Sequence, residues 1–217
     1  MLVSRFITSL AVCMIFTAFL IVEVRRLRYS AYAYIAQSSL LVTVFLSIAI
    51  LIPEPHFYIW ALSALITKVI IVPWLILTTI SKVSVEYEES PILPLSASII
   101  IDLVLIIVGF ILAFYIPLPF VKMGFRICLG VSLALFLLGV YGMASKTCAI
   151  KQTICLCHME NGIHLLLATL GYTSPVTVEI GILTDAVLTI AIMLYLSYLI
   201  KKVSGSLNTF RLSSLRW

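Results

Sequence analysis

Long runs of apolar residues, separated by short polar links, set the pattern of this chain. A helix needs about 20 residues to cross a bilayer, and seven runs reach that length: 6–24, 31–52, 57–80, 94–115, 121–143, 149–172 and 177–199. Open strands cannot satisfy their backbone groups in lipid, and the runs are too long for the strands of a barrel. The pattern therefore predicts an all-α fold, a polytopic membrane bundle of about seven transmembrane helices.

Lysine and arginine are divided unequally between the two sets of links. The side that includes the N-terminus holds Arg5, Lys122 and Arg126. The opposite side holds Arg25, Arg26, Arg28, Lys82, Lys146, Lys151, Lys201, Lys202, Arg211 and Arg216. Because cytoplasmic loops are enriched in lysine and arginine, we expect the N-terminus outside, the C-terminus in the cytoplasm, and the chain in the cytoplasmic (inner) membrane of the cell.

The order of the runs predicts three parts: an N-terminal three-helix unit at 1–90, a connecting transmembrane helix at 91–118, and a C-terminal three-helix unit with a cytoplasmic tail at 119–217. The two units share a weak similarity, in which Thr67-Lys68 falls where Thr184-Asp185 falls and Gln37 falls near Glu160. A three-plus-one-plus-three order would place both units in the same orientation, as a parallel repeat requires.

The composition excludes several functional classes. Hydrophobic residues make up 63% of the 217 residues, charged residues 11%, and the mean hydropathy is +1.21, whereas a soluble domain carries about 25% charged residues. The basic residues lie at the ends of apolar runs and form no patch for nucleic acid. The five cysteines include Cys155 and Cys157 as C-x-C without a second pair, which argues against a zinc site or a disulfide framework. No enzyme motif is present, so we expect no catalytic residue, no bound metal and no cofactor.

Four ionisable residues lie deep inside the predicted helices. At 1.5 Å per residue, Lys68, Asp102, Glu160 and Asp185 lie about 11 to 16 Å from a helix end, near the middle of a core about 30 Å thick. Placing each charge there costs roughly 2.5 to 3.5 kcal/mol. Buried acid–base pairs that hold helices together would account for one such charge. Four at a similar depth favour a lateral path for protons or cations.

The predicted helix at 149–172 is the richest in polar residues. Glu160 and His164 lie four residues apart and share a face, and a histidine titrates near neutral pH, so this is a candidate proton-passing pair. His158 points elsewhere, and we expect it to be a packing or interfacial residue. Asn161-Gly162 would allow a close approach between helices or a local break of the helix.

Three further residues adjoin the predicted path. Pro73 follows Lys68 by five residues and leaves the carbonyl of Val69 without its helical donor, which bends the helix beside the charge. His56 and Glu179 lie near the outer surface, where each is either a mouth of the path or a wetted helix end.

Two segments carry a resemblance to a known family: ALITKVIIVP and HMENGIHLLLATLGYTSPVTVEIGILTDAVLTIAIM. They resemble the hydrogenase-4 component E family, which are membrane-arm subunits of group 4 nickel-iron hydrogenases and formate hydrogenlyases. The resemblance runs nearly end to end. Within that family the last three helices are similar to the K-type small subunit of respiratory complex I and to the C-type small subunit of multi-subunit cation/proton antiporters.

The resemblance implies roles for individual residues. Glu160 corresponds to the acid on the middle helix of the K-type subunit, Asp185 takes the place of the acid on its third helix, and Lys68 matches the lysine of the family's T-K-V segment. The tail Gly205-Ser206-Leu207-Asn208 is similar to the cytoplasmic end of these subunits. Asp102 has no counterpart in the family.

The resemblance also implies a subunit that couples redox chemistry in partner proteins to the movement of protons or sodium ions. The implied partners are antiporter-like large membrane subunits, an anchoring subunit similar to the H-type subunit of complex I, and soluble nickel-iron hydrogenase and iron–sulfur subunits. Two alternatives stay open: a stand-alone secondary transporter for a cation or small metabolite, and a structural spacer.

Overall fold

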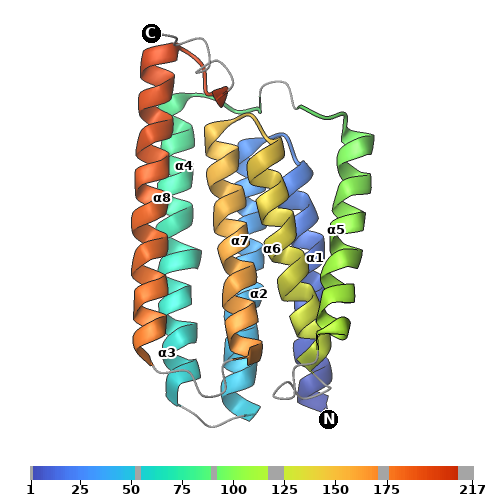
Figure 1. Cartoon of the computed structure of the whole chain (residues 1–217). Coiled ribbons are helices and arrows are strands. Elements are labelled where there is room, and N and C mark those ends of the chain that lie inside the picture. The colour runs from blue at the N-terminus through green and yellow to red at the C-terminus, as the bar shows by residue number, and fades with distance from the viewer. Residues whose placement is uncertain (1, 52–54, 89–91, 117–124, 171–175, 210–217) are drawn as a thin grey trace.

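The structure, a computed structural model, describes the backbone of residues 2–51, 55–88, 92–116, 125–170 and 176–209, and within them all side chains except those of 2–5, 51, 55–56 and 176–186. The helices are α1 (Leu2–Glu23), α2 (Leu27–Leu51), α3 (Pro55–Ala64), the π-helix η1 (Leu65–Ile71), α4 (Val72–Val83), α5 (Leu95–Tyr115), α6 (Arg126–Ser145), α7 (Ala149–Leu170) and α8 (Val176–Ser204). Since α3, η1 and α4 follow one another without a break, the described residues form seven helical rods side by side in an elongated bundle (Figure 1). The predicted all-α membrane bundle is confirmed.

Six of the rods are long and apolar enough to cross a membrane. The seventh, α7, is also 22 residues long but is more polar, and its polar side chains are turned inward: Lys151, His158, Asn161 and His164 are all buried. This helix packs between α6, α2 and α8. These four side chains are therefore enclosed by protein.

Glycines bring α6 and α7 into close contact. A Cβ atom built on Gly139 would lie 2.5 Å from Cβ and 2.7 Å from Cα of Met159, and one built on Gly162 would lie 2.7 Å from the backbone nitrogen of Phe136. No side chain fits at either position without a shift of the neighbouring helix, and small residues let membrane helices approach closely. The expected close approach at Gly162 is present.

The chain after α8 folds back onto the start of α7. The N–H of Ala149 donates to the carbonyl of Leu207, and the N–H of Thr209 donates to the carbonyl of Thr147. Gly205, which ends α8, has a φ of +72°, a left-handed conformation that glycine adopts at no steric cost. The tail thus closes the end of the bundle at which α1, α6 and α8 end, the upper end in Figure 1.

Candidate functional site

Lys68 lies in the middle of the π-helical segment η1. The wider turn shows in the N–H of Val72, which donates to the carbonyl of Thr67, five residues back. Pro73, in the first turn of α4, has no N–H and cannot complete an α-helical bond to Val69. Local π-helical turns inside α-helices are frequent at functional sites. The irregularity predicted beside Lys68 is therefore present, as a π-helical segment.

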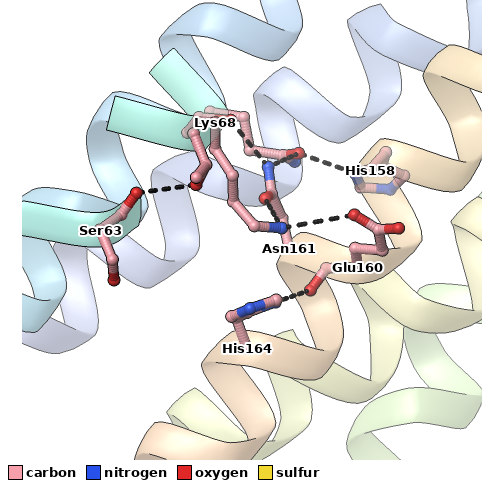
Figure 2. A network of polar contacts seen from close by, with 9 residues as sticks. Ser63, Lys68, His158, Glu160, Asn161 and His164 are labelled. Atoms are coloured by element: carbon pink, nitrogen blue, oxygen red, sulfur yellow. Dashed lines mark hydrogen bonds and ion pairs between the residues drawn. The ribbon is translucent and has the colours of Figure 1, made fainter. Parts of the chain in front are cut away.

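The amine of Lys68 meets two groups of α7 (Figure 2). Its Nζ donates to Oδ1 of Asn161 at 3.1 Å and lies 3.7 Å from Oε2 of Glu160. The side chains of Lys68 and Glu160 are 2% and 14% exposed. The structure thus joins two of the residues that the sequence singled out separately, as an ion pair inside the bundle.

Asn161 carries this pair into a wider network. Its Nδ2 donates to Oε1 of Gln37 at 3.2 Å and to Oγ of Ser38 at 3.0 Å. Gln37 Nε2 in turn donates to the carbonyl of Met14 at 3.2 Å. The network therefore spans α1, α2, η1 and α7. From the sequence, Gln37 was expected only as a repeat position, and no polar contact was expected of Asn161 or Ser38. The adjacent polar residues Gln37 and Ser38 inside an apolar helix were the signal that could have indicated these contacts.

The two histidines of α7 are each held through one ring nitrogen. His158 Nδ1 lies 2.8 Å from Oε1 of Gln37, and His164 Nδ1 lies 2.7 Å from the backbone carbonyl of Glu160. Both oxygens only accept, so each Nδ1 is the donor, and a neutral ring then has a bare Nε2. In the described structure both Nε2 atoms are buried without a hydrogen-bond partner.

These contacts refine what was expected of the histidines. His164 shares the face of Glu160 but reaches its backbone, and the structure shows no bond from His164 to the Glu160 carboxylate. His158 is fully buried, which fits a packing residue and not an interfacial one. It also belongs to the polar network.

Asp102 lies in a different place. It is on α5, 0% exposed, and its electrostatic neighbours are Glu23 and Lys146. Among the described contacts, none joins Asp102 to Lys68 or Glu160. The side chains of His56, Glu179 and Asp185 lie outside the described residues, so their predicted places on the path stay predictions.

The described side chains contain no group of three His, Cys, Asp or Glu residues that could hold a metal ion. What the site offers chemically is a set of proton donors and acceptors. Besides the two histidine Nε2 atoms, Oε2 of Glu160 and the hydroxyl of Tyr34 are buried without a hydrogen-bond partner. Such atoms are rare in folded proteins and call for an explanation such as a bound water or a catalytic role.

Comparison with a protein family and comparison with individual known proteins give consistent results. Residues 127–217 match the family of NADH-ubiquinone/plastoquinone oxidoreductase chain 4L. Over 214 residues, 98% of each chain, the protein is 31% identical to the hydrogenase-4 component E proteins of Escherichia coli strain K12, Escherichia coli O157:H7 and Shigella flexneri. No solved structure matches significantly. With this identity over nearly its whole length, the chain belongs to the hydrogenase-4 component E family.

Proposed function

We propose that this chain is the membrane subunit of a hydrogenase-type complex in which Lys68 and Glu160 pass protons sideways through the membrane arm. Two results support a subunit of such a complex: the relatives are named as a hydrogenase component, and residues 127–217, which include Glu160, match a small chain of a respiratory oxidoreductase. The reducing and oxidising centres lie in partner proteins, and this chain is not catalytic by itself.

The ion pair between Lys68 and Glu160 is the observation that carries the proposal. Attraction between two charges is strong where water is excluded, so the charge state of one group controls the other. When a proton reaches the Glu160 carboxylate, the carboxylate becomes neutral and the ammonium of Lys68 loses its counter-charge. Lys68 then releases a proton to the next base, and its neutral amine takes the proton from Glu160. This restores the ion pair and moves one proton across it.

The polar groups around the pair suit this exchange. Asn161 holds Lys68 Nζ at 3.1 Å, which keeps the amine close to α7 in either charge state. The Nε2 atoms of His158 and His164, which have no hydrogen-bond partner in the described structure, are acceptor positions through which a proton can pass.

We extend the path to residues whose side chains lie beyond the described part of the structure. Asp185 on α8 is proposed to continue the path past Glu160, as the family resemblance implies. His56 and Glu179 are proposed as its outer mouth. Asp102 is proposed as a protonatable group on the other flank of α6.

The proposed surroundings follow from the same family. The partners are antiporter-like large membrane subunits, an anchoring subunit similar to the H-type subunit of complex I, and the soluble nickel-iron hydrogenase and iron–sulfur subunits. The chain lies in the cytoplasmic membrane with its N-terminus outside and its C-terminus inside, the orientation that the lysine and arginine distribution favours.

Replacing one carboxylate in the assembled complex tests the proposal. Glu160→Gln keeps the shape and removes the titratable group, so proton movement driven by hydrogenase turnover should slow by about 100-fold, the scale of a lost proton-transfer group. Electron transfer measured with an artificial acceptor should continue. Glu86→Gln is the matched control, because Glu86 is exposed after the end of α4.

Three outcomes would overturn the proposal. Full proton movement in the Glu160→Gln complex would mean that this chain is a structural spacer. Movement of sodium in place of protons, lost in the same variant, would make the site a sodium path. Rapid flux through the purified chain alone in liposomes would indicate a stand-alone transporter.

A further inference from the structure

A second buried polar cluster lies at the upper end of the bundle in Figure 1, where α1 and α6 end and α5 begins. Its centre is Glu23, the last residue of α1. Glu23 Oε1 accepts hydrogen bonds from Oγ of Ser98 at 2.6 Å and from Nζ of Lys146 at 3.2 Å. Ser98 Oγ also lies 2.8 Å from the hydroxyl of Tyr141. The Glu23 carboxylate is therefore well supplied with donors and with a counter-charge.

Asp102 joins this cluster without such support. It follows Ser98 by four residues, so both side chains lie on the same face of α5, and Glu23 and Lys146 are its electrostatic neighbours. Asp102 is 0% exposed, and in the described structure neither of its carboxylate oxygens has a hydrogen-bond partner. A buried carboxylate without a donor is strongly disfavoured. A hydrogen bond between two carboxyl groups, however, forms once one of them carries a proton.

The balance of charged groups in the cluster favours the binding of one proton. Among the described residues, the acids of the cluster are Glu23, Glu88 and Asp102, and the bases are Lys146 and Lys151. Lys151 is fully buried and donates to the carbonyl of Val24 at 2.6 Å and to Ser30 at 3.0 Å. The other described titratable groups beside the cluster are Tyr141, Cys148 and Cys155. Three ionised acids against two lysines leave one surplus negative charge, which a single proton cancels.

Asp102 is the acid that takes this proton. Among the described buried oxygens without a hydrogen-bond partner are both carboxylate oxygens of Asp102 but only Oε1 of Glu88, and the attraction of Lys151 and Lys146 offsets part of the cost of burying Glu88. Glu23 is bonded to Lys146 and Ser98. A sodium ion would need several oxygen ligands, and the positive ammonium of Lys146 on Glu23 Oε1 opposes a second cation beside that oxygen.

We propose that Asp102 and Glu23 form a proton-binding site, in which Asp102 holds one proton and donates it in a hydrogen bond to the Glu23 carboxylate. The proton comes from water at the bundle end: hydronium transfers it to an Asp102 oxygen and leaves water. The site is separate from the Lys68–Glu160 pair, and its existence does not depend on the proposed relay.

Infrared difference spectroscopy on the full-length chain in lipid nanodiscs tests this site. In unaltered protein at neutral pH we expect a carbonyl-stretch band of a protonated carboxylic acid that shifts in heavy water. Asp102→Asn should abolish the band, and because a neutral isostere replaces a neutral acid, that variant should fold. Glu23→Gln should weaken or abolish the band, because the two remaining acids then balance the two lysines and Asp102 no longer needs the proton. Glu86→Gln should leave it in place.

The same spectra contain the results that would contradict the proposal. A band that survives in both Asp102→Asn and Asp102→Glu without a shift would place the proton elsewhere. Loss of the band on adding sodium chloride at constant pH would show a cation site. Neither result would bear on the proposed proton path through Lys68 and Glu160. That path is tested separately, by proton transport in the complex with Glu160→Gln.

Discussion

At the scale of single residues, Lys68 brings an ammonium group into the apolar interior, and two groups of α7 keep it there. Asn161 contributes a hydrogen bond at 3.1 Å and Glu160 a counter-charge at 3.7 Å. Isolated buried charges cost several kcal/mol each, and removal of one member of a buried pair leaves the other uncompensated. The pair should therefore be visible in the stability of the chain as well as in transport.

Lys68→Met should destabilise the folded chain by about 3 kcal/mol, the cost of leaving a buried acid without its partner. The double variant Lys68→Met with Glu160→Met should recover most of that loss, because no unpaired charge remains. Thermal unfolding of the purified chain in detergent measures both. Equal unfolding temperatures for the single and double variants would mean that the two side chains do not interact.

Glu88, in the link after α4, gives a pH dependence of a definite sign. Burial raises the pKa of Glu88 above its ordinary value of 4.5, while Lys151 and Lys146 lower it. The folded chain thus binds this proton more tightly than the unfolded chain. The stability contribution is complete below pH 4.5 and is lost as the pH rises through the higher pKa of the folded state.

Glu88→Gln should remove that part of the pH profile. Unfolding temperatures measured in steps upward from pH 4.5 should fall less steeply in this variant than in the unaltered chain. Glu86→Gln, two residues away and exposed, should follow the unaltered profile. A steeper fall in Glu88→Gln would show that Glu88 is held in its charged form by the two lysines.

The sequence indicated which residues carry charge into the bundle, but not which of them meet. Lys68, Glu160 and Asp102 were all placed at membrane depth by counting along the chain. Their partners depend on the rotation of each helix about its axis, which counting does not give. For this reason Asn161 and Glu23 received no role in the polar network or the acid cluster, and His164 was paired with a carboxylate where the structure shows the backbone carbonyl of Glu160.

At the scale of helices, the contact of α6 with α7 positions the site. Met159, the residue before Glu160, packs against Gly139 so closely that a Cβ atom there would lie 2.7 Å from the Met159 Cα. The π-helical turns of η1 place Lys68 on the other side of α7. The ion pair thus depends on η1, α7 and α6, although α6 itself makes no bond to the pair.

Gly139→Ala should push α6 away from α7 and disturb the pair without touching it. Overpacking of this kind costs about 1 to 3 kcal/mol, and coupled proton movement should fall along with stability. Val140→Ala, at the exposed neighbouring position of α6, is the control and should have little effect on either. Unfolding temperature and proton movement measured on the same preparations would show the link, and unchanged values in Gly139→Ala would contradict it.

Apolar runs predicted the helices well because a bilayer fixes both their length and their composition. The interior position of α7 was harder to predict from the sequence. Its polar residues lower its hydropathy, and only the structure shows that neighbouring helices enclose them. The π-helical form of η1 could be anticipated from Pro73 only as an irregularity. A missing N–H breaks the α-helical pattern, but the sequence does not show how the backbone will re-form its bonds.

At the scale of the whole molecule, the described outer face of α5 is almost wholly apolar, and that of α8 exposes several large apolar side chains. On α5 these exposed side chains include Ile100, Leu103 and Ile107, and on α8 Leu188 and Ile192. Such faces suit lipid or the helices of neighbouring membrane subunits. A path that hands protons sideways needs neighbours to receive them, so the chain on its own should conduct poorly.

The purified chain in liposomes should therefore show proton flux close to that of protein-free liposomes, read by an entrapped pH-sensitive dye under an imposed pH gradient. Co-reconstitution with the membrane subunits that purify with it should raise the flux. High flux through the chain alone, abolished in Glu160→Gln, would instead describe a self-sufficient transporter.

The most direct test of charge exchange between Lys68 and Glu160 is the ratio of protons moved to electrons transferred by the reconstituted complex. Lys68→Met should reduce this ratio by about 100-fold, the scale of a lost proton-transfer group, while electron transfer continues. Lys82→Met, an exposed lysine on α4, should keep the ratio of the unaltered complex. An undiminished ratio in an intact Lys68→Met complex would contradict the account.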